Sequence, residues 1–131
     1  MSEVSDKRKF IRKLKEIKEN LSYDYQKNYT EIYNACVDID NEYGNMYLCD
    51  HIHDYGLLDE DDIQYWLERN NNDLDRLRFF IGDTYSSDMY RLNAYGNLEN
   101  IGIDDFKDLC DELIDVVRED LKSLKLAENV R

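Results

Sequence analysis

The sequence predicts a single α+β domain that is mainly α-helical, with four to five helices and one short β-hairpin. Three observations predict this class. Apolar residues recur every three or four positions along much of the chain, which is the spacing of one helix face. The chain has no proline and only five glycines, so linkers between domains are not expected. Its 131 residues, of which 42% are hydrophobic, suffice for one core.

The N-terminal third of the chain predicts two helices. The first spans about residues 5–20, and its apolar face consists of Phe10, Ile11, Leu14, Ile17 and Leu21. Either Ser22 caps a second helix over 23–43, or the first helix continues through this serine. The second stretch repeats the three-to-four spacing, and Gly44 followed by Asn45 is expected to end it.

The middle of the chain is less regular. Residues 46–58 fit neither the helix period nor the strand period, and they predict a short helix or a turn. Asp59 is expected to cap a helix that continues to about Arg69, because acids in the first turn favour its dipole. Asp73 is expected to start another helix that ends at Gly82.

The C-terminal part predicts the hairpin and the longest helix. Residues 89–101 place β-favouring segments on both sides of a Tyr-Gly-Asn tip. A long amphipathic helix follows over about 103–126, and its apolar stripe consists of Phe106, Leu109, Cys110, Leu113, Val116, Val117 and Leu124. The single domain of residues 1–131 thus combines the basic helix 5–20 with an acidic, tyrosine-rich body over 22–131.

The charge balance excludes several kinds of partner. The chain carries 30 acidic and 17 basic residues, a formal net charge of −13. An acidic face repels nucleic-acid phosphates and anionic lipids, so neither nucleic acid nor membrane is expected to bind it directly. No N-terminal apolar run or membrane-spanning run is present, and three cysteines without CxxC spacing are typical of a reducing cytoplasm.

The charges are distributed unevenly. Residues 1–18 contain seven bases and three acids, whereas residues 28–68 contain eleven acids and no lysine or arginine. The same acidic stretch contains six tyrosines, a residue type that is enriched at protein interfaces. The stretch is therefore either a solubilising face or a surface that meets a basic partner. The basic helix either pairs with acids of its own chain or of a second copy, remains solvated, or contacts nucleic acid or an acidic surface of a partner.

The long C-terminal helix carries a row of acids opposite its apolar stripe. The row consists of Asp104, Asp108, Asp111, Glu112, Asp115 and Glu119. At 100° per residue these positions fall within about a third of the circumference, and neighbouring carboxylates are about 5–6 Å apart. Because this spacing resembles that of single-strand phosphates, the row predicts nucleic-acid mimicry. The alternative is an ordinary solvated face.

No motif in the chain predicts catalysis. Cys49, Asp50, His51, His53 and Asp54 offer metal-ligating side chains, but no second CxxC or HxxxH pair completes a site. The alternatives are one histidine in the core with the other in water, or a local pH response. The chain also lacks phosphate-binding and nucleophile motifs. We therefore expect no enzyme activity, no catalytic residue, no metal and no cofactor.

Two segments carry a resemblance to a group of proteins. Phe79–Tyr85 (FFIGDTY) and Tyr90–Leu98 (YRLNAYGNL), followed by the acidic helix, resemble small acidic proteins of phages and integrative elements over about residues 57–117. Some proteins of that genetic setting are anti-CRISPR or anti-restriction inhibitors. The resemblance implies a non-catalytic inhibitor in the bacterial cytoplasm, whose partner is a basic nucleic-acid-binding protein such as a Cas9-type nuclease or a restriction enzyme.

The expected partner-binding surface combines three sets of residues. The first is the helical row of Asp104, Asp108, Asp111, Asp115 and Glu119, acting as phosphate mimics. The second extends it with Asp38, Asp40, Glu42, Asp59, Glu60, Asp61 and Asp62. The third provides Tyr43, Tyr47 and Tyr55 as anchors. The alternative function is a small helical scaffold or adaptor, which acts through helix–helix contacts as a homodimer.

Overall fold

The structure is a computed structural model, which describes residues 2–58, 60–69, 71–72, 90–92 and 98–130. Five helices lie within these ranges: α1 (Glu3–Glu19), α2 (Tyr25–Tyr43), α3 (Tyr47–Tyr55), α4 (Glu60–Arg69) and α6 (Ile103–Val130). The strands are β1 (Leu57–Leu58), β2 (Tyr90–Leu92) and β3 (Leu98–Asn100). The predicted class is confirmed: the chain is mainly helical, with a short antiparallel hairpin and a long C-terminal helix.

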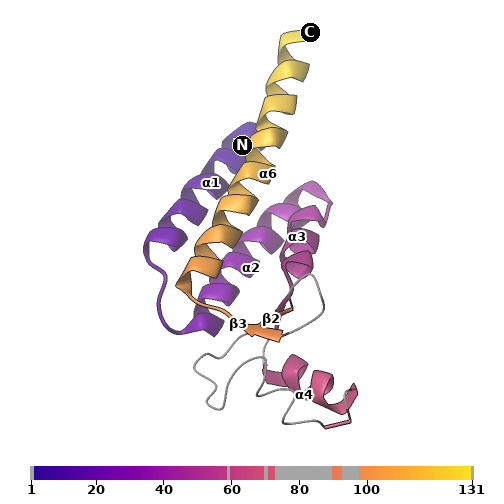
Figure 1. The fold of residues 1–131 in the computed structure, drawn as a ribbon. Coiled ribbons are helices and arrows are strands. Elements are labelled where there is room, and N and C mark those ends of the chain that lie inside the picture. Colours follow the sequence, from indigo (N-terminus) through magenta and orange to yellow (C-terminus); the bar gives the residue numbers. More distant parts are fainter. Residues whose placement is uncertain (1, 59, 70, 73–89, 93–97, 131) are drawn as a thin grey trace.

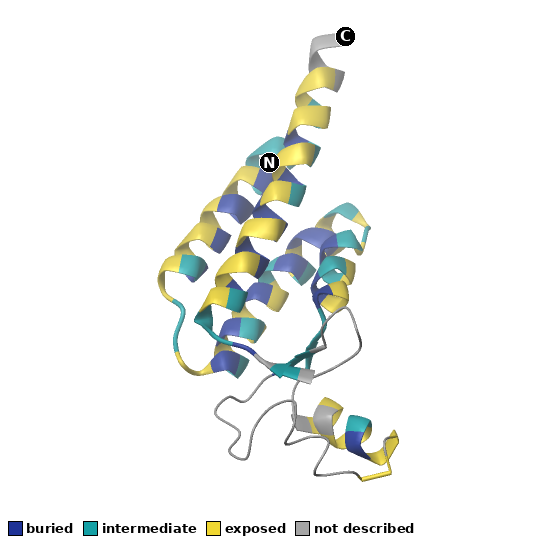
Figure 2. Cartoon of the chain, in the orientation of Figure 1, coloured by how far each residue is buried: buried dark blue, intermediate teal, exposed yellow. Residues whose placement is uncertain are grey.

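Helices α1, α2, α3 and α6 pack against one another to form the main body (Figure 1). The predicted apolar stripe of α6 supplies much of its core, because Phe106, Leu109, Leu113 and Val117 are fully buried at three-to-four spacing. Figure 2 shows the buried positions of α1, α2, α3 and α6 on the sides that these helices turn toward one another. Helix α4 lies beyond the sheet, apart from this body (Figure 1).

The first two helices are separate, and Asp24 caps the second. The Asp24 carboxylate accepts a hydrogen bond from the Lys27 backbone N–H at 3.1 Å, as an N-cap residue does. The prediction that Ser22 caps this helix, or that one helix runs through it, is wrong. Ser22 is held instead by the buried Asn28 amide, which donates to the Ser22 carbonyl at 2.8 Å. Gly44 ends α2 in the left-handed conformation, as predicted.

The hairpin belongs to a small three-stranded sheet of order β1-β2-β3. The register pairs Arg91 with Leu57 on one side and with Glu99 on the other. The β1 strand was not predicted. Residues 46–58 were expected to form a short helix or a turn, and they form α3 followed by this strand. The predicted helix from Asp73 to Gly82 and the hairpin tip 93–97 lie outside the described residues.

A buried lysine connects α1 to α6 through an ion pair. The Lys7 side chain is only 7% exposed, and its ammonium donates to Glu3 and Asp120 at 3.0 and 3.1 Å. Burial alone lowers the pKa of Lys7, but the hydrogen bonds to Glu3 and Asp120 outweigh it and raise the pKa above its ordinary value. The Tyr47 hydroxyl donates to the same Asp120 carboxylate, so α3 joins this network.

Candidate functional site

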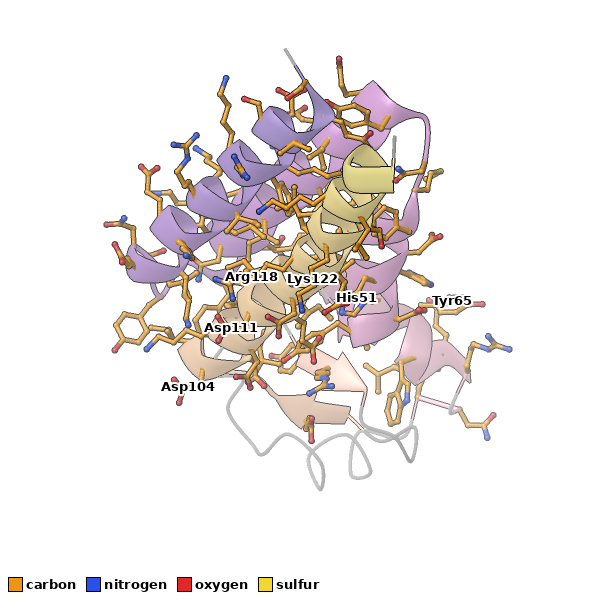
Figure 3. The ribbon with its side chains drawn as sticks, turned by 90° about the horizontal axis from the view of Figure 1, so that it is seen from above. His51, Tyr65, Asp104, Asp111, Arg118 and Lys122 are labelled. Carbon is orange, nitrogen blue, oxygen red and sulfur yellow. The ribbon has the colours of Figure 1, made fainter. Side chains whose placement is uncertain are left out.

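The acidic row of α6 lies on the solvent side of the helix. Asp104 is the most open member, with 95% of its side chain exposed, and Asp108, Asp111, Asp115 and Glu119 are exposed as well. The row begins at a well-fixed helix end, because the Asp105 carboxylate accepts a hydrogen bond from the Gly102 backbone N–H at 2.7 Å. Figure 3 shows Asp104 and Asp111 along this helix.

Cations accompany the row more closely than the sequence suggested. Asp104 pairs with Lys107 at 3.8 Å, Asp115 with Arg118 at 3.8 Å, and Glu119 with Lys122 at 3.2 Å. The Lys18 ammonium of α1 lies 2.8 Å from one Asp111 oxygen and 2.9 Å from the other. Within the described part of the chain, only Asp108 among these five acids has no cationic group within 4.0 Å.

These ion pairs reduce the negative charge that the row presents to a partner, but they do not cancel it. Exposed pairs contribute about 0–1 kcal/mol each, so a basic partner can exchange with them. The pair between Lys18 and Asp111 is the most constrained, because the Lys18 ammonium donates to both oxygens of the Asp111 carboxylate. Asp111 is therefore the member of the row least free to meet a partner, whereas Asp104 and Asp108 are the most available.

From the second turn of α2 to the end of β1, the chain carries acids and neither lysine nor arginine. Residues 28–58 contain six acids and no lysine or arginine. Five of these acids are exposed: Glu31, Asp38, Glu42, Asp50 and Asp54. The predicted surface residues Asp38 and Glu42 are thus accessible, and Glu31 is an exposed acid that the sequence analysis did not include. The sequence did contain a signal for Glu31: it lies seven residues before Asp38, which places both acids on the same face of a helix.

Asp40 does not belong to this surface, contrary to the prediction. The residue is 2% exposed, and its Oδ2 accepts a hydrogen bond from the Cys49 backbone N–H at 3.0 Å. Cys49 is the third residue of α3, whose N-cap residue Met46 makes no side-chain capping bond. Asp40 therefore caps α3 from the end of α2, which requires it to face inward.

Tyr55 is not a surface anchor either. It is 7% exposed, its hydroxyl donates to the Asp105 carbonyl at 3.0 Å, and the Arg91 guanidinium lies 4.1 Å from its ring centroid. Tyr43 and Tyr47 are half-buried, and their hydroxyls donate to Asp6 and Asp120. These three tyrosines therefore join helices of the same chain.

The tyrosines that are available to a partner are different ones. Tyr23, Tyr33 and Tyr65 are exposed, and none was predicted as an anchor. Tyr65 points outward from α4, apart from the row on α6 (Figure 3). Tyr33 stacks on Tyr29 with ring centroids 5.8 Å apart, so it is held in place on α2. Exposed aromatic rings of this kind are common at protein interfaces.

The acids near α4 complete the predicted set. Asp59 lies outside the described residues, and so does the side chain of Glu60. Asp61 and Asp62 are exposed on α4. Because α4 lies beyond the sheet (Figure 1), these acids do not continue the row of α6 directly.

The histidine and cysteine cluster separates into independent contacts. His51 Nε2 lies 3.2 Å from a Glu112 oxygen, while His53 is exposed. Burial raises the pKa of the Cys49 thiol to about 11, with a further contribution from its hydrogen bond to Asp40. Burial likewise raises the pKa of Cys110 to about 12. Over the described ranges, no group of three or more metal-ligating side chains is arranged to hold an ion.

Buried tyrosine hydroxyls make the fold sensitive to alkali. The hydrogen bond to Asp6 raises the pKa of Tyr43 to about 12, and burial raises the pKa of Tyr55 to about 12 from an ordinary 10.0. Between these values the unfolded chain loses protons that the folded chain keeps, so the free energy of unfolding decreases as pH rises. The raised pKa of Lys7 acts in the same direction.

We therefore expect the chain to unfold between about pH 10 and about pH 12. Circular dichroism and tyrosinate absorbance, followed over the same titration, should change together. A Tyr55→Phe variant lacks the hydrogen bond to Asp105, so it should be about 1 kcal/mol less stable than the wild-type chain at neutral pH. Its free energy of unfolding should then decrease less steeply as the pH rises, because the Tyr55 hydroxyl no longer titrates. If helix content persists while all tyrosines ionise at their ordinary pKa, this expectation is wrong.

No helix in the described ranges combines the length and the apolar character needed to cross a bilayer. In comparisons with protein-family models, curated proteins and solved structures, the chain matches none of them. The segment Phe79–Tyr85, which contributes to the resemblance to acidic phage proteins, lies outside the described residues. The chemistry of the described surface is therefore the basis for a functional proposal.

Proposed function

We propose that this chain is a non-catalytic inhibitor of a bacterial nucleic-acid-handling defence enzyme, carried by a phage or mobile element. Its partner is a basic protein, a Cas9-type effector (anti-CRISPR activity) or a restriction enzyme. The observation that supports this best is the row of exposed carboxylates along one face of α6, whose opposite face is buried in the core. A rigid anionic row is the form that a basic nucleic-acid channel accepts.

The geometry supports competition with nucleic acid. Successive acids of the row are three or four residues apart, so their carboxylates are spaced by about 5–6 Å. Asp104 and Asp108 are exposed, and Lys107 approaches Asp104 only at 3.8 Å. Arginines and lysines of a channel can replace such exposed local pairs at little cost in free energy. The cation-free acids of α2 and α3 add to the negative field that steers association.

The thiols favour binding over covalent chemistry. A cysteine nucleophile acts as a thiolate and needs a lowered pKa. Burial instead raises the pKa of Cys36, Cys49 and Cys110. Their surroundings are therefore those of packed, protonated thiols, which supports an inhibitor that acts through its surface.

A competition experiment tests the proposal. The immobilised chain is exposed to a bacterial lysate, and the retained proteins are eluted either with duplex DNA or with a neutral polymer at the same ionic strength. We expect a basic nuclease or effector to be retained and to be released by DNA alone. The purified partner should then lose DNA cleavage when the chain is added. Retention that DNA does not affect would contradict nucleic-acid mimicry.

The alternative adaptor function gives the opposite pattern. A homodimeric scaffold acting through helix–helix contacts would retain its partner equally in the presence of DNA. Sedimentation of the isolated chain separates the two further, because the scaffold hypothesis predicts a dimer and the inhibitor hypothesis requires none.

A further inference from the structure

A second surface, on the other side of α1, is independent of the α6 row. A groove of about 840 Å³ runs between α1 and α2. Its floor is apolar and consists of Phe10, Ile17, Ala35, Ile39 and the ring of Tyr43. Along α1 the lining extends from Asp6 to Asn20, which corresponds to about 21 Å of helix at 1.5 Å per residue. The groove is therefore as long as about four turns of a helix.

The walls of the groove are acidic. Five carboxylates line it, against one lysine, Lys13. The acids are Asp6 and Glu16 from α1, and Glu31, Asp38 and Glu42 from α2. In the part of the chain that the structure describes, no cationic group lies within 4.0 Å of the last four of these acids. This arrangement differs from the α6 row, where lysines and an arginine accompany most of the carboxylates.

A hydrogen bond between α1 and α2 fixes one end of the groove. The Tyr43 hydroxyl of α2 donates to the Asp6 carboxylate of α1 and joins the two walls at one end. Glu31, Ala35, Asp38 and Glu42 follow one another at intervals of three or four residues along α2. Two antiparallel helices with such stripes present the same kind of surface that they would offer to a third helix of a bundle.

From these observations we infer that the α1–α2 groove binds an amphipathic basic helix of a partner protein, with apolar side chains on the floor and lysines or arginines against the two acidic walls. Helix-in-groove recognition uses this combination of an apolar stripe and flanking charge. Nucleic acid and anionic lipid are repelled by the unpaired carboxylates. Among amphipathic helices that could place apolar side chains on the floor, the acidic walls favour those that also carry positive charge.

The α1 helix of a second copy does not offer the required stripe. The exposed face of α1 is basic, with Arg8, Lys9, Arg12 and Lys15. Its apolar residues, however, are buried against the other helices of the same chain, and Phe10 and Ile17 already form part of the groove floor. The α1 helix therefore supplies charge without the apolar side chains that would contact the groove floor.

A model peptide tests the inference directly. The probe is a fluorescein-labelled 14-residue helix, about the length of the groove at 1.5 Å per residue, with leucines at heptad a and d positions and lysines elsewhere. The control peptide carries glutamates in place of the lysines. We expect the lysine peptide to raise the fluorescence anisotropy saturably with the full chain, and the glutamate peptide to give no binding.

Matched variants then locate the binding site. Glu31→Gln, Asp38→Asn and Glu42→Gln together should weaken binding of the lysine peptide at least about ten-fold. The control combines Glu19→Gln, Asp54→Asn and Glu68→Gln, which removes the same charge from exposed positions outside the groove; its affinity should change less than about two-fold. Circular dichroism verifies that both variants fold.

Three outcomes would overturn the inference. If both triple variants lost the same affinity for the lysine peptide, net charge alone would attract the peptide. Binding of the glutamate peptide would mean that the acidic walls play no part. A dimer of the wild-type chain that dissociates in the groove variant would identify a second copy as the occupant. The peptide assay uses neither the captured partner nor DNA, and its variants leave Asp104–Glu119 unchanged, so its failure is distinct from a failure of the competition experiment that tests the proposed inhibitor function.

Discussion

A variant with Asp104→Asn, Asp108→Asn and Asp115→Asn is expected to bind the captured basic partner at least about ten-fold more weakly than the wild-type chain. These three acids are exposed on α6, and each would face a cation of the partner's channel in the proposed complex. Asparagine keeps the shape of aspartate and removes its charge. The loss should appear in the dissociation constant measured by surface plasmon resonance.

The control variant removes three charges away from the row, through Asp54→Asn, Asp61→Asn and Glu68→Gln, all of which are exposed. Its affinity should fall only slightly, because long-range attraction is screened over about 10 Å at 0.1 M salt. The wild-type association rate should decrease as salt rises, and the row variant should show a smaller decrease. Equal affinities of the row variant and the wild type would show that α6 presents only a solvated face.

Phe106→Ala is expected to destabilise the fold by about 4 kcal/mol. Phe106 is fully buried in the first turn of α6, and its ring centroid lies 5.4 Å from that of Tyr25 in α2. Truncation removes this aromatic contact and leaves a cavity between the two helices. The melting temperature should fall by more than about 10 °C.

Lys107→Ala is the matched control for this prediction. Lys107 is the next residue on α6, it is exposed, and its pair with Asp104 measures 3.8 Å. The free energy of unfolding in urea should therefore change by less than about 0.5 kcal/mol. A small effect of Phe106→Ala, similar to that of the control, would show that the start of α6 does not pack on α2 as described.

The helices could be predicted because their signals are local. The α6 stripe is visible in the chain as a run of apolar residues at three-to-four spacing, and Gly44 marks the end of α2. The start of α2 could not be settled in this way, since Ser22 and Asp24 are both good caps. A contact between residues six positions apart decides it: the buried Asn28 amide donates to the Ser22 carbonyl, and Asp24 accepts from Lys27.

The candidate surface depends more strongly on contacts between distant residues. Asp40 and Tyr55 are residue types that are common on protein surfaces. Each is buried here, and its side chain makes a hydrogen bond to a backbone group of a neighbouring helix. The pairing of Asp111 with Lys18 joins residues 93 positions apart. Charge spacing along one helix predicts which acids face water, but it cannot predict which cation of another helix lies beside them.

The packing of α1 on α6 also sets an order of events during synthesis. Lys7 and Asp120 are 113 positions apart, and Lys18 and Asp111 are 93 apart. At a translation rate of about 5–20 residues per second, α1 emerges from the ribosome about 5–20 s before the helix that covers it. Until then α2 is the main partner of its apolar face among the described elements. The native contacts of α1 are therefore completed only after α6 has been made, so the assembly of the core waits for its last described helix.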